Sequence, residues 1–149
     1  MKLVHEMTFR AMLKPPLAIG AGPIGTRMYY ELTGGEVVGD RLRGKVLGGG
    51  EWALIASDGY LRADVRAQVE THDGAALYVQ YVGLLEMNAA VQSATETGSG
   101  TEFSDQRFYT NPRFETGDAQ YAWVNTTFFI GEGRILPGLG VEYRVWRPA

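Results

Sequence analysis

The sequence contains no cysteine and only two histidines, His5 and His72. The absence of cysteine excludes disulfides, thiolate catalysis and cysteine-based metal sites. Two histidines leave little material for a nucleophilic triad, and His72 adjoins the turn signal Asp73-Gly74. No run of acids has the spacing of a calcium loop. The sequence therefore predicts no bound metal.

Long hydrophobic runs and excess positive charge are also missing. No stretch approaches the ~18 apolar residues of a membrane-spanning helix. Polar residues interrupt Met1 to Leu13, so we expect no signal peptide. The formal net charge is −3, whereas proteins that bind nucleic acid or acidic lipid usually carry excess positive charge. A cytoplasmic protein with a small-molecule partner is the simplest expectation.

The segment from Gly20 to Gly25 matches the dinucleotide-binding fingerprint in form only. That fingerprint requires a preceding parallel strand and a following helix. Here Pro15 and Pro16 precede it, Pro23 lies inside it, and a strand pattern follows. We expect a flexible rim loop and no cofactor.

Alternating apolar and polar residues dominate most of the chain. Leu3 to Leu13 alternates with His5 on its apolar side, and the clearest alternation is that of Leu61, Ala63, Val65, Ala67 and Val69. Asp58-Gly59 and Asp73-Gly74 predict tight hairpins on either side of this strand. Gly34-Gly35 predicts another hairpin, and Gly44 to Gly50 predicts a looser return. Such short connections indicate an antiparallel meander.

Two segments stand apart from this pattern. Glu86 to Gln106 predicts a short helix at Asn88 to Thr95 and a glycine hinge at Thr97 to Thr101, which is either a lid or an ordinary connection. Ala119 to Ile130 predicts one long strand, because its residues favour sheets. On that strand Tyr121, Trp123 and Asn125 would share one face, which we expect to point inward.

These elements predict a single all-β domain over residues 1–149. We expect an antiparallel up-and-down β-barrel of about eight to ten strands with little helix, because so large a sheet usually closes. Barrels of this size hold side chains or one small ligand.

Motifs along the whole chain resemble uncharacterised protein family 0311, also called domain of unknown function 3237. They are Phe114-Glu115-Thr116-Gly117, Tyr121-Ala122-Trp123-Val124-Asn125, Phe129-Ile130-Gly131, Asp64-Val65-Arg66 and Val141-Glu142-Tyr143-Arg144-Val145-Trp146. The resemblance implies a small, cytoplasmic, bacterial β-barrel without an assigned function. Where the family pattern often has arginine, this sequence has Tyr109.

Polar residues on the predicted strands, and Glu115 at a corner between Pro112 and Gly117, form the candidate site. If they converge inside the barrel, Glu115 or Asp64 would act as a general base, with a pKa raised by aromatic neighbours. The ligand-binding candidates are Trp123, Asn125, Arg66, Tyr109, Tyr121 and His5. The competing interpretation makes Asp64 and Arg66 a solvated strand face.

Three functions stay open at this point. The protein is a cofactor-free enzyme doing acid–base chemistry on a small oxygenated metabolite, a non-catalytic carrier of such a molecule, or a structural oligomer with a packed interior. The sequence has more large apolar side chains than one small barrel interior can hold, among them Trp52, Trp146 and Tyr29. We therefore expect a homo-oligomer, a dimer in the simplest case.

Overall fold

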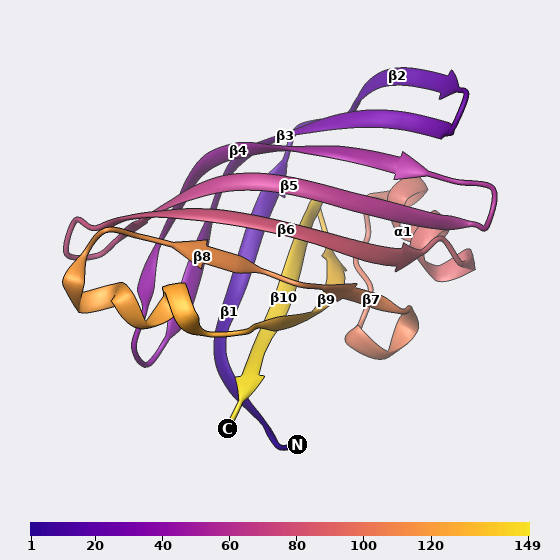
Figure 1. Ribbon diagram of the computed structural model, residues 1–149. Helices are drawn as coiled ribbons and strands as arrows, with labels where there is room; N and C mark the ends of the chain where they lie inside the picture. The colour runs from indigo at the N-terminus through magenta and orange to yellow at the C-terminus, as the bar shows by residue number, and fades with distance from the viewer.

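A computed structural model describes residues 1–149 as one closed antiparallel barrel (Figure 1). The strands are β1 (Leu3–Leu13), β2 (Leu17–Gly22), β3 (Gly25–Gly39), β4 (Arg43–Ile55), β5 (Tyr60–Thr71), β6 (Ala76–Glu86), β7 (Phe108–Thr110), β8 (Arg113–Glu115), β9 (Ile130–Leu136) and β10 (Gly140–Pro148). The helical segments are α1 (Ala89–Thr97) and two 3₁₀ segments, η1 (Phe103–Asp105) and η2 (Ala119–Thr126).

The barrel closes through β1, which pairs with β10 on one side and with β3 on the other. The remaining order is β10, β9, β7, β6, β5, β4, β3, so neighbours in sequence are mostly neighbours in the sheet. Two strands are additions: β2 extends beyond β3, and β8 pairs with β6 after β7 ends. The predicted all-β antiparallel barrel is confirmed.

The meander from β4 to β6 follows the sequence pattern closely. Gly59 and Gly74 have φ of 79° and 90°, as tight turns between antiparallel strands require. The alternating residues of β5, Leu61, Ala63, Val65, Ala67 and Val69, are all buried in the core. Their polar neighbours point away from the interior. Period-2 alternation therefore sets both the strand and its inner face here.

The predictions made from the glycine-rich segments before Glu51 are wrong. Gly34-Gly35 lies within β3, and Gly44 to Gly50 lies within β4, so neither is a turn. A Cβ at Gly35 would lie 1.9 Å from the Arg10 carbonyl oxygen, so this glycine permits close strand approach in a curved sheet. The segment from Gly20 to Gly25 is also no loop, because it forms the β2–β3 hairpin.

The two ends of the barrel carry different helical segments (Figure 1). The predicted helix is confirmed as α1, with Asn88 accepting a hydrogen bond from the Val91 amide and Gly98 ending the helix at φ 70°. The predicted strand from Ala119 to Ile130 is wrong. That segment forms η2 at the opposite end, and only Ile130 belongs to a strand. None of the helices is long and apolar enough to cross a membrane.

The change to η2 has an identifiable physical cause. Asp118 accepts a hydrogen bond from the Gln120 amide and so caps the segment. Tyr121 and Val124 are then buried, about 1% exposed each, against the core. Burial of these side chains at the barrel end outweighs the strand preference of the local sequence.

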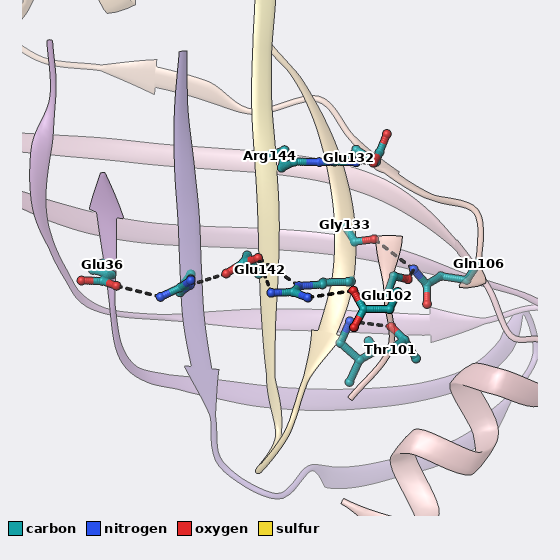
Figure 2. A network of polar contacts seen from close by, with 11 residues as sticks. Glu36, Thr101, Glu102, Gln106, Glu132, Gly133, Glu142 and Arg144 are labelled. Atoms are coloured by element: carbon teal, nitrogen blue, oxygen red, sulfur yellow. Dashed lines mark hydrogen bonds and ion pairs between the residues drawn. The ribbon is translucent and has the colours of Figure 1, made fainter. Parts of the chain in front are cut away.

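A chain of ion pairs crosses the outer side of β3, β1, β10 and β9 (Figure 2). Glu142 is its centre, and its buried carboxylate pairs with Arg10 and, at 2.9 Å, with Arg134. Glu36 and Glu102 bind the outer sides of these two arginines at 3.1 and 3.2 Å. A buried carboxylate needs such partners, and these ion pairs connect β1 and β9 to β10 where the barrel closes.

Candidate functional site

An interior cavity of about 430 Å³ lies at the end of the barrel that α1 covers. Its wall comes from both the barrel and the helix, and is mostly apolar, with Met28, Ile55, Leu61, Leu85, Val91 and Phe108 among its residues. The volume is within the range of small-molecule sites. The other end of the barrel is filled by Tyr121, Val124 and Phe129 from and beside η2.

Glu51 is the only charged side chain that lines this cavity. It lies on β4 two residues before Ala53, which is completely buried, so both face the interior. Burial raises the pKa of Glu51 to about 7, and the negative charge of Asp64 adds to this effect. No hydrogen bond or positive charge offsets the cost of its ionisation. The cavity thus contains a carboxyl group that gains and loses its proton near neutral pH.

Tyr30 lies beside Glu51 on the cavity wall. The two residues are directly opposite one another in the β3–β4 pairing. Burial raises the pKa of Tyr30, and the charge of Glu51 raises it further. The Tyr30 hydroxyl has only the Met28 sulfur as a partner, at 3.9 Å. A thioether is a weak acceptor, so this hydroxyl is free to donate to a ligand.

Two further tyrosines, Tyr81 and Tyr143, lie close enough to Glu51 for its charge to affect the pKa of their hydroxyl groups. Tyr81 and Tyr143 are 4% and 3% exposed, with ring centroids 5.3 Å apart in an edge-to-face arrangement. Burial raises the pKa of both hydroxyls, and the Glu51 charge contributes. Phe108 joins this cluster to the cavity, because its ring lies 5.2 Å from that of Tyr143. The ionisable groups in and beside the cavity are therefore one carboxyl group and several neutral phenols.

Sequence reasoning missed Glu51 because Gly44 to Gly50 was interpreted as a loop, which left Glu51 outside any strand. A signal was nevertheless present. Extending the alternation backwards from Ile55 and Ala53 places Glu51 on the same, inner face, while Trp52 is on the outer face and 43% exposed.

The predicted site residues do not converge inside the barrel. Asp64 and Arg66 point outward from β5, as the solvated-face interpretation expected. Glu115 on β8 and Tyr109 on β7 are exposed. His5 is exposed on β1, where its ring contacts Trp146 with centroids 5.2 Å apart. The expectation of an interior cluster of these residues was wrong, since their strand faces are the outer ones.

Tyr121, Trp123 and Asn125 belong to η2 rather than to a strand, so they do not share an inward face. The Tyr121 hydroxyl donates to Asp73 at 2.7 Å and ties η2 to the β5–β6 turn. Trp123 is half-buried beneath the Arg41 guanidinium, 3.7 Å from its ring centroid. Both residues hold the end of the barrel in place.

We expect Asn125→Ala to lower stability without affecting the cavity. The Asn125 side chain accepts from the Thr116 amide at 2.8 Å and donates to the Thr116 carbonyl at 2.9 Å. Losing both bonds should cost about 1–2 kcal/mol. Urea unfolding measures this loss, with Thr126→Ala, on an exposed neighbour, as the control. An unchanged midpoint for Asn125→Ala would show that the bonds contribute nothing.

The prediction of a dimer rests on large aromatic residues, which lie on the outer side of the barrel. Tyr29 and Trp52 pair across β3 and β4 with ring centroids 5.1 Å apart. Val82, Leu84 and Tyr109 are exposed on nearby strands that line the same shallow surface as Trp52. The dimer stays a prediction.

Comparison with known proteins places this geometry among related barrels. Residues 1–148 match the family described as Protein of unknown function (DUF3237). A UPF0311 protein of Rhodopseudomonas palustris (strain TIE-1) is 34% identical over 114 residues, 74% of each chain. The crystal structure of the conserved protein of unknown function RPA1785 from R. palustris superposes with a TM-score of 0.88 at 26% identity, over 98% of this chain and 96% of that one. An enzyme from Penicillium herquei, at 23% identity and TM-score 0.72 over 98% and 92% of the two chains, has the same fold.

Proposed function

The chain belongs to the DUF3237 family, and we propose that it is a cofactor-free acid–base enzyme acting on a small, mostly apolar, oxygen-bearing molecule in the cavity beside Glu51. Glu51 moves the proton. The apolar wall holds the rest of the substrate.

One observation carries the proposal: a lone carboxyl group without a counter-charge lines a mostly apolar cavity. An unpartnered buried acid destabilises a protein, so a purely structural position would favour an apolar residue. A general base works best with a pKa near the working pH, and the pKa of Glu51 is about 7. Perturbed acids in cavities are typical of catalytic sites.

The two other functions fit these observations less well. A barrel with a packed interior would leave no cavity of about 430 Å³. A carrier function would explain the apolar wall of the cavity but not the unpaired carboxyl group of Glu51. The enzyme from Penicillium herquei supports only the compatibility of this fold with catalysis, since the likeness concerns the fold.

Filling the cavity should abolish binding of a small apolar probe. We expect the neutral fluorophore N-phenyl-1-naphthylamine to bind the native protein with increased fluorescence. Ala94 is 3% exposed, lies on the inner side of α1 and lines the cavity, so Ala94→Phe should weaken binding at least about tenfold. Ala89→Phe changes the exposed side of the same helix and should bind normally.

The fluorescence titration is run on all three proteins after circular dichroism has shown that each retains its sheet. Equal binding by the two variants would place the probe outside the cavity. Absence of probe binding to the native protein would remove the basis for an interior site.

A further inference from the structure

The pairing of β3 with β4 places a carboxyl group and a phenol side by side on the cavity wall. Tyr30 and Glu51 are direct partners in the antiparallel register, and both line the cavity. Side chains of such partners on one face have Cβ atoms about 4.5–5.5 Å apart. One small ligand can therefore contact both groups at adjacent atoms.

The two groups are suited to opposite tasks. The Tyr30 phenol stays protonated at neutral pH, because burial and the charge of Glu51 both raise its pKa. Its hydroxyl lacks a strong acceptor within the protein, the Met28 sulfur at 3.9 Å being its one partner. Tyr30 can thus donate a hydrogen bond to an oxygen atom of a ligand. Glu51 can accept a proton from the ligand once it is ionised.

Resting on the proposed function, we propose that the cavity takes neutral, enolisable ketones, with Glu51 removing a proton from the carbon next to the carbonyl group and Tyr30 donating a hydrogen bond to the carbonyl oxygen. The C–H bond breaks, its electrons form the C=C bond of the enolate, and the C=O electrons move to oxygen. Glu51 then returns the proton to the same carbon or to a conjugated one. Tautomers or double-bond isomers are exchanged, and no oxidant or other reactant is consumed.

The charges around the site favour a neutral substrate. No lysine or arginine lines the cavity, so nothing there would compensate a carboxylate or phosphate group on the ligand. Among the groups on the surrounding strands, the Asp64 charge raises the pKa of Glu51, and the Glu51 charge raises the pKa of three phenols, Tyr30, Tyr81 and Tyr143. The negative charge created by deprotonation therefore relies on Tyr30 for stabilisation.

Hydrogen–deuterium exchange of a simple ketone tests this assignment. We expect the native protein to accelerate loss of the α-proton signals of 2-tetralone in D₂O, followed by NMR, with a rate that rises with pH around the Glu51 pKa of about 7. Glu51→Gln should lower the protein-catalysed rate at least about a hundredfold. Tyr30→Phe should lower it about a hundredfold while keeping the pH midpoint near that of the native protein.

Tyr29→Phe is the matched control, because Tyr29 is the neighbouring tyrosine on the outer face, where it contacts Trp52. It should exchange at the native rate. Displacement of N-phenyl-1-naphthylamine by 2-tetralone separates the two hypotheses. If the ketone displaces the fluorophore but no deuterium enters it, the enolisation proposal fails and the binding site stands. If neither compound binds, the proposed function itself fails. Exchange that survives Tyr30→Phe unchanged would overturn the role of Tyr30.

Discussion

Glu51→Gln is expected to stabilise the protein by about 3 kcal/mol at pH 8 and to give little change below pH 5. The folded-state pKa of Glu51 is about 7 instead of 4.5, so the folded protein binds more protons than the unfolded chain between these values. Stability is therefore lost as pH rises through this window, at about 1.4 kcal/mol per unit of pKa difference. Glutamine resembles the protonated acid and avoids that loss.

Urea unfolding at pH 5 and pH 8 measures this effect. Glu115→Gln removes an exposed carboxyl group on β8 and serves as the control, with no pH-dependent gain expected. A native protein whose stability does not fall between the two pH values would mean that Glu51 ionises as freely as an exposed acid. Combined with loss of ketone exchange, a gain in stability at pH 8 would identify Glu51 as a residue retained for activity at the expense of folding.

Gly49→Ala should cost at least about 3 kcal/mol or prevent folding, whereas Gly48→Ala should change stability by less than about 1 kcal/mol. Gly49 has φ 140°, and a Cβ there would lie 2.1 Å from the Arg66 carbonyl oxygen and 2.7 Å from the Ala67 Cα. Backbone of β5 occupies that space, so no side-chain rotation relieves the clash. A Cβ at Gly48 meets nothing closer than the Leu32 carbonyl oxygen at 3.6 Å.

The two glycines are adjacent in one strand, beside the point where the β4–β5 register shifts. A bulge of this kind bends the strand and helps the sheet to close. Thermal unfolding of both variants by circular dichroism compares them directly. Similar melting temperatures for the two alanine variants would show that β4 relaxes away from β5 at low cost, contrary to our expectation.

The parts of the fold that sequence predicted well are those that local chemistry determines. Asp58-Gly59 and Asp73-Gly74 form the expected turns, because a positive φ is required there and glycine supplies it. The alternation of β5 predicted its inner face correctly, because one side of that strand meets the core. Neither inference needed knowledge of distant residues.

The site was not predictable in the same way. In the sequence, glycines that permit close strand approach look the same as glycines that form turns. The glycines up to Gly50 therefore predicted a turn, and Glu51 was not recognised as part of a strand. Most of the segment from Ala119 to Ile130 forms η2 although its residues favour strands, because Tyr121 and Val124 are buried at the end of the barrel in that conformation. Both outcomes depend on where remote strands pass.

Pairing of β1 with β10 also has a consequence for how the chain reaches this structure. Arg10 and Glu142 meet across this seam although 132 positions separate them in sequence. Such non-local pairing slows folding, because the chain must be brought together before the contact stabilises it. Hairpins from β3 to β6 can form early and leave an open, curled sheet.

Until β1 and β10 pair, the free edges of these two strands and the apolar inner face are open to other chains. Their pairing removes both edges in one step. Aggregation during refolding should thus depend on the time taken by this closing step, so crowded or warm conditions that favour encounters between chains compete directly with barrel closure.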